Sequence, residues 1–330
     1  MFGTYRTLLA VFVVIQHLGG VPSIGSYAVF GFYILSGYLM TFIMQNNYGY
    51  SFSGVFKYGI NRALRIYPLY WISIIISIAI IWLLGETYTS DFHESIVFPK
   101  STNDWIKNIF ILFPDLNSSR FTPPAWALTV EIFFYILIGL GLSRNKKLVV
   151  IWLLISIAYH LIALIYNFDR YFSLAAASLP FATGAFIFFF KEKILSKTSI
   201  FLGQKAQHIP ALLLALIITN WYIGYSLATS FYLNYILCSL MVIYLANRKS
   251  LPFISKKFDL LMGDYSYPIY LIHFQIGILV MLSLNYFELK VQAESLTLLT
   301  FSLPIIFIFA WILSKTVESP IEQLRKQIKR

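Results

Sequence analysis

Residues 5–20, YRTLLAVFVVIQHLGG, form the first apolar segment of the chain and carry two ionisable side chains, Arg6 at the start and His17 eleven residues later. Eleven residues are close to three helical turns, so both side chains lie on nearly one helix face, about 16 Å apart along the axis. In a bilayer about 30 Å thick, this spacing places Arg6 at one surface and His17 near the middle. Burying an ionisable group at that depth is costly, so His17 is either functional or satisfies a neighbouring helix.

The composition is typical of a polytopic membrane protein. The 330 residues are 58% hydrophobic and only 12% charged, and the mean hydropathy is +0.73, which lies well outside the range of soluble domains. The single cysteine, Cys238, excludes a disulfide framework and a thiolate metal site. The net charge of +11 comes from short basic clusters between apolar runs, so it indicates membrane topology rather than nucleic-acid binding.

The apolar runs predict an all-α integral membrane protein with about ten transmembrane helices in one membrane-embedded domain, residues 1–330. Each run has about the twenty residues that a helix needs to cross a bilayer. The first run could be mistaken for a cleavable signal peptide, but Gln16 and His17 interrupt its apolar core, so we expect it to remain. The predicted spans are residues 5–20, 27–45, 66–84, 124–143, 148–166, 171–190, 210–227, 229–246, 265–285 and 296–316.

The distribution of basic residues predicts that both termini are cytoplasmic. With the N-terminus inside, the inner loops and the tail (residues 317–330) receive 20 of the 25 Lys and Arg residues, and the outer loops receive five. This is the positive-inside pattern of a multi-pass plasma (inner) membrane protein. The outer connection, residues 85–123, contains DWIKNIFILF (residues 104–113), which is too short to span and predicts an interfacial helix.

A pair of arginines follows the second predicted span, in FKYGINRALRIYPLYW (residues 56–71). Arg62 and Arg65 are three residues apart, on one face of a helix that then enters the membrane. Two guanidinium groups at the cytoplasmic edge can each hold a phosphate or carboxylate with two hydrogen bonds. The alternative is ordinary positive-inside anchoring.

Two further ionisable residues lie within predicted spans. Glu131, in PPAWALTVEIFFYIL (residues 123–137), lies about 10 Å below the outer surface, where a carboxylate must be protonated or paired. Because His17 lies at a similar depth, the two could be a general base and the group that orients it, or simply a structural pair. His273, in YSYPIYLIHF, is expected to be structural. No Walker loop, dinucleotide fingerprint, HExxH or GxSxG motif is present, so ATP-driven transport and metalloprotease or hydrolase chemistry have no support.

Taken together, these segments resemble the membrane-bound acyltransferase family 3 over almost the whole chain. The matching segments, in the family's order, are Arg6 with His17, VFGFYILSGYLMT (29–41), NRALRIYPLYW (61–71), WALTVE (126–131), YSYPIYLIH (265–273) and VESPIEQLRK (317–326). One departure is that VFGFYILSG lacks the acidic residue often found before the family's aromatic pair; Phe30, Gly31 and Phe32 stand there. We expect the stand-alone type, without an appended esterase-like domain.

The resemblance implies an O-acyltransferase that moves an acyl group, usually acetyl, from cytoplasmic acyl-CoA to a hydroxyl of a surface or lipid-linked glycan such as O-antigen, capsule or exopolysaccharide. His17 matches the family's intramembrane histidine, Arg6 its first-helix arginine, and Arg62 with Arg65 its Arg-x-x-Arg motif. These arginines would hold the phosphates of the donor. His17 would act as general base with Glu131 orienting it, without a metal; a covalent acyl-histidine is an alternative.

The competing prediction is a multi-span transporter or flippase of a glycan or lipid, because buried ionisable residues and kinking prolines also suit transport. The distribution of charge favours the enzyme. An arginine cluster at one surface with one histidine above it is not the mid-membrane polar site of a transporter, and no half-repeat is detectable. The expected partners are therefore the bilayer, acyl-CoA and a glycan, and not nucleic acid.

Overall fold

The computed structural model describes residues 2–113, 118–202, 208–224, 228–247 and 254–328, and every regular element in these ranges is a helix. The predicted all-α class is therefore confirmed. Five basic residues that we assigned to the inner loops and tail lie outside the described residues, namely Lys205, Arg248, Lys249, Lys329 and Arg330.

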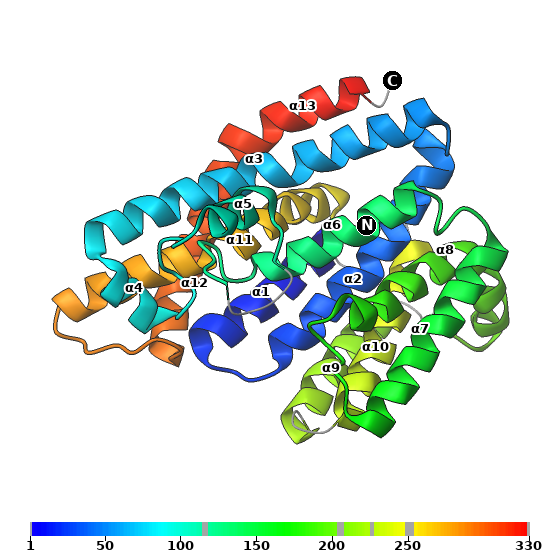
Figure 1. Ribbon diagram of the computed structural model, residues 1–330. Coiled ribbons are helices and arrows are strands. Elements are labelled where there is room, and N and C mark those ends of the chain that lie inside the picture. The colour runs from blue at the N-terminus through cyan, green and yellow to red at the C-terminus, as the bar shows by residue number, and fades with distance from the viewer. Residues whose placement is uncertain (1, 114–117, 203–207, 225–227, 248–253, 329–330) are drawn as a thin grey trace.

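The chain forms thirteen α-helices and two π-helical turns within the described residues (Figure 1). In order they are α1 (Gly3–Gly19), α2 (Ile24–Ile43), η1 (Met44–Tyr48), α3 (Phe52–Leu84), α4 (Glu86–Phe92), α5 (Thr102–Phe110), α6 (Ala125–Gly139), α7 (Lys146–Tyr166), α8 (Leu174–Leu202), α9 (Ile209–Gly224), α10 (Ala228–Asn247), α11 (Lys256–Tyr286), α12 (Leu296–Leu313), η3 (Ser314–Glu318) and α13 (Ser319–Ile328).

Seven helical stretches of the described chain are long and apolar enough to cross a membrane, which confirms a polytopic membrane protein. They are Ile24–Tyr48, Phe52–Leu84, Lys146–Tyr166, Leu174–Ile194, Thr229–Asn247, Lys256–Tyr286 and Leu296–Ile328. The other three predicted spans correspond to α1, α6 and α9, which have 17, 15 and 16 residues. These helices are shorter than the twenty or so residues that a straight crossing requires.

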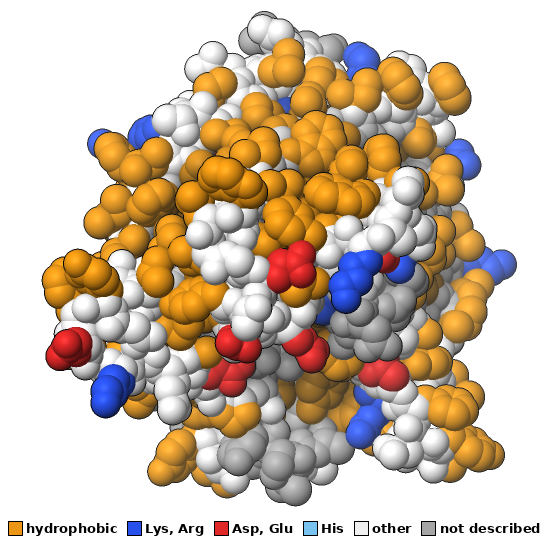
Figure 2. Space-filling view, turned by 60° about the vertical axis from the view of Figure 1, so that its left-hand side comes forward, with side chains coloured by type: hydrophobic (Ala, Val, Ile, Leu, Met, Phe, Trp, Pro, Cys, Tyr) orange, Lys and Arg blue, Asp and Glu red, His pale blue; other side chains and the backbone are white. Residues whose placement is uncertain are grey.

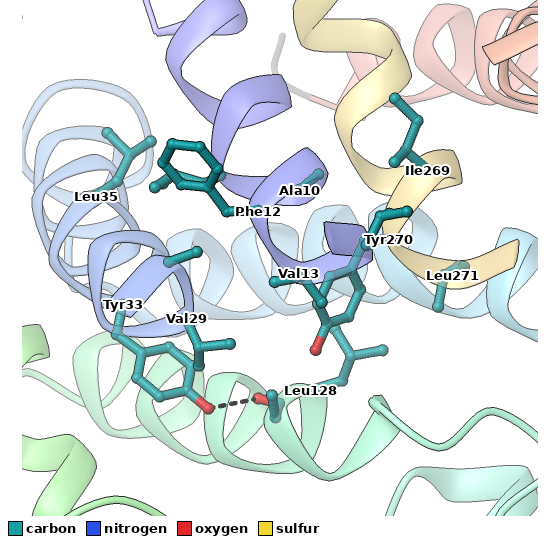
Figure 3. Close-up of a cluster of buried hydrophobic side chains, with 14 of the residues drawn as sticks. Ala10, Phe12, Val13, Val29, Tyr33, Leu35, Leu128, Ile269, Tyr270 and Leu271 are labelled. Carbon is teal, nitrogen blue, oxygen red and sulfur yellow. Dashed lines mark hydrogen bonds between the residues drawn. The ribbon is translucent and has the colours of Figure 1, made fainter. Parts of the chain in front are cut away.

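Helix α1 lies at the centre of the molecule, between α2 and α11 (Figure 1). Its buried side chains, among them Ala10 and Val13, face both neighbours, and Figure 3 shows them between Val29 of α2 and Ile269 of α11. The middle of the helix is a continuous apolar run, residues 8–15, and most of its side chains are buried against the neighbouring helices. The short length of α1 is therefore compatible with its central place.

The two ends of α1 are held by different means. At its start, the backbone N–H groups of Gly3 and Thr4 donate to the Asp259 carboxylate of α11 at 3.4 and 2.9 Å, which satisfies N–H groups that a helix start otherwise leaves free. At its end, Gly20 adopts φ 67°, a left-handed conformation that glycine tolerates best. His17 therefore lies in the last turn of α1.

A largely apolar surface surrounds this interior. Figure 2 shows one face on which hydrophobic side chains cover most of the area while acidic side chains gather in the lower half. Large apolar side chains are exposed along several helices, including Trp82 of α3, Ile155 of α7 and Ile308 of α12. An apolar surface of this extent indicates contact with a lipid bilayer.

The connection between α3 and α6 is folded back on α3. Tyr70 donates a 2.7 Å hydrogen bond to the Asn108 carbonyl, and Ser77 donates one of 2.7 Å to the carbonyl of Phe121. Helix α5 occupies much of the predicted segment 104–113, and Trp105 and Ile106 are exposed on it. An interfacial position for α5 stays a prediction.

Helices α2 and α8 approach each other backbone to backbone through two glycines. A Cβ atom built on Gly37 would lie 2.2 Å from the Phe181 carbonyl oxygen, and one on Gly184 would lie 2.0 Å from that of Ile34. No side chain fits at either position without moving a helix.

We expect Gly37→Ala to lower the free energy of unfolding by about 1–3 kcal/mol, because the added methyl group overpacks this contact. Gly59→Ala is the matched control: Gly59 is also helical, and a Cβ there meets nothing within 4 Å. The control should stabilise by about 0.5–1 kcal/mol through helix propensity. Thermal unfolding of the two variants in detergent checks this, and equal shifts would contradict the α2–α8 packing.

Candidate active site

The last turn of α1 brings His17 into contact with His273 of α11. Nδ1 of His17 lies 2.9 Å from Nε2 of His273, and Nδ1 of His273 lies 2.9 Å from the carbonyl oxygen of Tyr270 one turn earlier. His273 is fully buried, whereas His17 is partly exposed. The two imidazoles and the carbonyl form one chain of hydrogen bonds that ends at an accessible histidine.

The two imidazole rings meet edge to edge. Their planes differ by only 7° and their centroids are 5.2 Å apart. Because an imidazole N–H and an imidazole lone pair both lie in the ring plane, coplanar rings in edge contact point donor and acceptor at each other. Phe274 packs against both His17 and His273, with centroid distances of 5.0 and 4.8 Å, and so helps to hold the rings in place.

A third imidazole, His93, lies just after α4 and within electrostatic range of His17 and His273. Its ring packs edge-on against Phe274 at 5.0 Å. The backbone N–H of Ser95 donates to Nδ1 of His93 at 3.3 Å, so a neutral His93 carries its hydrogen on Nε2. The segment between α3 and α6 therefore contributes a third imidazole to the surroundings of His17, and this ring contacts Phe274.

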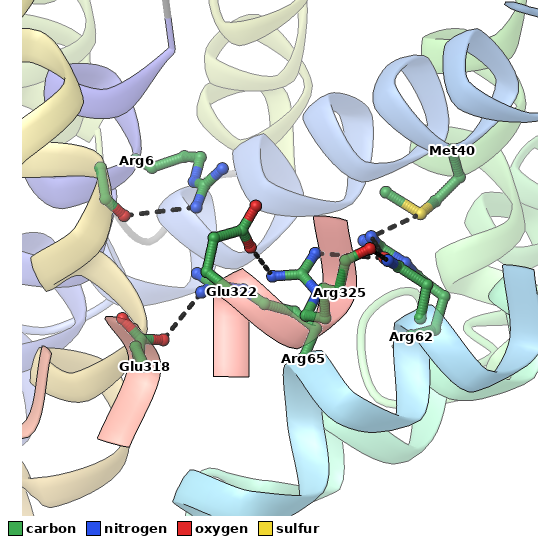
Figure 4. Close-up of polar contacts among 9 residues, drawn as sticks. Arg6, Met40, Arg62, Arg65, Glu318, Glu322 and Arg325 are labelled. Atoms are coloured by element: carbon green, nitrogen blue, oxygen red, sulfur yellow. Dashed lines mark hydrogen bonds and ion pairs between the residues drawn. The ribbon is translucent and has the colours of Figure 1, made fainter. Parts of the chain in front are cut away.

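The arginines predicted from the sequence lie together at the other end of α1 (Figure 4). Arg6 acts electrostatically on Arg65 and donates to the Gly263 carbonyl at 3.3 Å. Arg65 pairs with Glu318 at 2.8 Å and lies over the Tyr267 ring. We call this end of the helix bundle the basic end.

The C-terminal helix α13 completes this cluster. Arg325 pairs with Glu322 at 2.5 Å, and both Arg325 and Arg62 donate to the side-chain oxygen of Asn61, at 3.2 and 2.5 Å. Nε of Arg62 is buried and has no hydrogen-bond partner among the described residues. The cluster holds four guanidinium groups and two carboxylates, from Arg6, Arg62, Arg65, Arg325, Glu318 and Glu322. Glu131 and Asp264 also act electrostatically on Arg6 and Arg65 respectively, so carboxylates around the cluster equal its guanidinium groups in number.

The structure does not give Glu131 the partner that we expected. Its carboxylate accepts from Ser36 of α2 at 2.5 Å and from Tyr135 at 2.6 Å, while His17 is hydrogen-bonded to His273. Glu131 does face the interior, where it lies within electrostatic range of Arg6. Glu131 is therefore not hydrogen-bonded to His17 in the described structure, where the ring of His17 contacts that of His273 instead.

The reason is a difference in level along the bundle. The Tyr270 hydroxyl donates to the Pro124 carbonyl at 2.9 Å, so the start of α6 lies near the two histidines. Glu131 is seven residues further along α6, about 10 Å closer to the basic end. Counting from an assumed membrane surface placed Glu131 and His17 at one depth, but the short α1 puts His17 in its last turn.

Sequence reasoning missed three contributors to this region: His273, which we expected to be only structural, and Glu318 and Arg325 of the tail. A signal for the tail residues was present. Glu318, Glu322 and Arg325 are four and then three residues apart, the spacing of one helix face. The contact of His273 with His17 joins helices 256 residues apart in sequence and has no local signature.

The sequence was also compared with models of known protein families. A family model described as an acyltransferase domain matches residues 3–315. The chain belongs to this acyltransferase family. The family predicted from the motifs is thereby confirmed, and the chain is a membrane-embedded acyltransferase. A search of curated proteins and a search of solved structures each gave no match. In the described part of this acyltransferase, no group of three or more His, Cys, Asp or Glu side chains could hold a metal ion.

Burial and the nearby charge of Arg120 both lower the pKa of His93 from its usual value. We expect Arg120→Gln to raise this pKa, since it removes the like charge, and Arg170→Gln, which changes a distant arginine, to leave it unchanged. NMR titration of histidine-labelled protein, with His93→Asn for assignment, measures both effects.

The same shift predicts how stability depends on pH. Below about pH 6.5 the unfolded chain binds a proton at His93 that the folded chain resists, so stability should fall as the pH drops below that value. Stability that is flat between neutral and mildly acid pH in the wild type, together with an unmoved His93 titration in Arg120→Gln, would contradict this assignment.

Proposed function

We propose that this acyltransferase transfers an acetyl group from acetyl-CoA to a hydroxyl of a cell-surface or lipid-linked glycan, with His17 as general base. The observation that carries the proposal is the arrangement along α1: the partly exposed His17 imidazole lies three turns from Arg6, around which arginines of α3 and α13 gather. One end suits an anionic donor, and the other end suits proton transfer.

The donor side is assigned to Arg6, Arg62 and Arg65. Coenzyme A carries several phosphates, and guanidinium groups bind phosphate with paired hydrogen bonds. The gathering of four guanidinium groups at one end of α1 and the unpartnered Nε of Arg62 support this assignment. The resemblance to acyltransferase family 3 supports it independently, since these arginines match the family's motif positions.

The reaction is a single displacement at the thioester carbonyl. The acceptor hydroxyl loses its proton to His17 while its oxygen attacks the carbonyl carbon, and a C–O bond forms. The tetrahedral intermediate collapses with cleavage of the C–S bond, and the proton on His17 passes to the leaving sulfur. The products are an O-acetylated glycan and coenzyme A, and no covalent enzyme intermediate is needed.

Glu131 takes a different role from the one expected of it. Held by Ser36 and Tyr135 and within electrostatic range of Arg6, its carboxylate balances the charge of that arginine and helps to position it. We therefore assign Glu131 to the donor side as a positioning residue.

Orientation in the membrane follows from the same arrangement. We assign the basic end to the cytoplasm, where acyl-CoA is found, in agreement with the positive-inside distribution of the sequence. The acceptor glycan then reaches His17 from the opposite side of a plasma (inner) membrane. Membership of an acyltransferase family favours this enzyme over the transporter or flippase alternative.

We expect His17→Gln to lower the rate of acetyl transfer by about 10²–10⁴-fold, because glutamine keeps hydrogen-bonding capacity but cannot accept a proton at neutral pH. The measurement is acetylated glycan formed from radiolabelled acetyl-CoA per amount of membrane-inserted protein. His160→Gln is the control: His160 also lies within an apolar helix, but it bonds with Tyr232 and the Ala176 carbonyl. Full activity of His17→Gln would refute the base assignment.

We expect Arg65→Lys to weaken binding of coenzyme A by about tenfold or more, since an ammonium group cannot reproduce the paired hydrogen bonds of a guanidinium group. Calorimetry with coenzyme A on purified protein measures the effect. Arg144→Lys is the matched control, because Arg144 lies beside Tyr50 in the turn after α6 and not in the cluster. Equal affinities for coenzyme A in the wild type, Arg65→Lys and Arg144→Lys would show that Arg65 only anchors the helix at the membrane surface.

A further inference from the structure

We propose that His273 is a positioning residue that holds the hydrogen of His17 on Nδ1 and so leaves Nε2 of His17 as the basic nitrogen. The inference rests on the proposed function, in which His17 accepts the proton of the acceptor hydroxyl. It names the atom that accepts the proton and the group that decides which atom it is.

The backbone of α11 decides the state of His273. Its Nδ1 lies 2.9 Å from the Tyr270 carbonyl oxygen. A carbonyl oxygen can only accept, so this nitrogen carries a hydrogen. A neutral imidazole is protonated on one nitrogen only, and Nε2 of His273 therefore has a free lone pair.

The state of His273 in turn decides that of His17. Nδ1 of His17 faces the lone pair on Nε2 of His273 at 2.9 Å. Two lone pairs would repel each other at this distance, so Nδ1 of His17 must be the donor. The neutral His17 ring then has its lone pair on Nε2, the nitrogen that is not used in the contact.

The two imidazole rings differ in burial, and so in the role that each can take. His273 is 0% exposed, so it cannot reach a substrate. His17 is partly exposed and can. His273 therefore acts only through His17.

The arrangement also stabilises the charged intermediate state. When Nε2 of His17 takes the hydroxyl proton, the ring becomes an imidazolium whose Nδ1–H still points at the lone pair of His273. This hydrogen bond then has a charged donor, which makes it stronger. The proton leaves again from Nε2 to the sulfur of coenzyme A, so Nδ1 never exchanges its hydrogen during the reaction. The same arrangement, a histidine held in one tautomer by a second group, occurs in serine hydrolases, where the wrong tautomer lowers the rate by about 10⁴-fold.

Two substitutions of His273 separate positioning from packing. In His273→Gln the amide can donate to the Tyr270 carbonyl and present its oxygen to Nδ1 of His17, which preserves the tautomer. His273→Leu fills similar space but offers no acceptor. His160→Leu is the control for loss of a buried histidine elsewhere.

The first readout is the tautomer of His17, from nitrogen chemical shifts of histidine-labelled protein in nanodiscs. The His17 signals are identified as those missing from His17→Gln. We expect the hydrogen on Nδ1 in the wild type and in His273→Gln, and not in His273→Leu. A wild-type His17 with its hydrogen on Nε2 would overturn the inference, even if both variants failed to fold.

The second readout is kinetic. We expect kcat of His273→Leu to fall by about 10²–10⁴-fold with KM for acetyl-CoA unchanged, and His273→Gln to recover about tenfold or more of that loss. If His273→Leu keeps the wild-type kcat while His17→Gln is inactive, the role of His273 is overturned and that of His17 is not. Full activity of His17→Gln would instead overturn the proposed function, and the tautomer measurement would still stand as a test of the hydrogen-bond chain.

Discussion

The packing of α1 along α11 is the constraint on which the rest of the structure depends. At one end the backbones touch: a Cβ on Gly3 would lie 1.7 Å from the Asp259 carbonyl oxygen. At the other end His17 meets His273 at 2.9 Å. Fourteen residues separate the two contacts on each helix, so two parallel helices of equal rise bring both contacts into register.

The arginine cluster depends on helices from both ends of the chain. Arg6 comes from the N-terminal helix, Arg65 from α3 and Arg325 from the last helix. Glu318 and Glu322 offset part of the repulsion between the guanidinium groups, since they pair with Arg65 and Arg325.

The hydropathy of the sequence predicted where helices occur, because a membrane helix needs a long apolar run whatever its neighbours. The three-residue spacing of Arg62 and Arg65 also predicted that both lie on one helix face. Contacts between side chains of different helices could not be predicted from the sequence in the same way. Glu131 was assigned to His17 by counting depth from an assumed membrane surface, but the packing places it about 10 Å closer to the basic end, where its partners are Ser36 and Tyr135.

The histidine pair illustrates the same limit more sharply. A histidine within an apolar run can be structural or functional, and the run itself does not distinguish the two. His273 was therefore expected to be structural, and in one sense it is, because it is buried and bonded to its own helix backbone. Its effect on His17 depends on the relative rotation of two helices, which only the tertiary structure determines.

Helix α1 finally acts as a spacer between the two halves of the proposed chemistry. A helix changes length very little, so the separation of about 16 Å between Arg6 and His17 is set by eleven residues of fixed rise. Asp259 holds one end of α1 and Gly20 terminates the other, which prevents the helix from sliding or continuing. A donor held by its phosphates at the arginines must therefore extend a definite distance before its thioester reaches the imidazole. On this reasoning the length of the donor is selected by α1, whereas the tautomer of the base is selected by α11. Because the two helices are packed in register, the proposed mechanism makes one contact surface between them set both the position of the acyl group and the nitrogen that receives the proton.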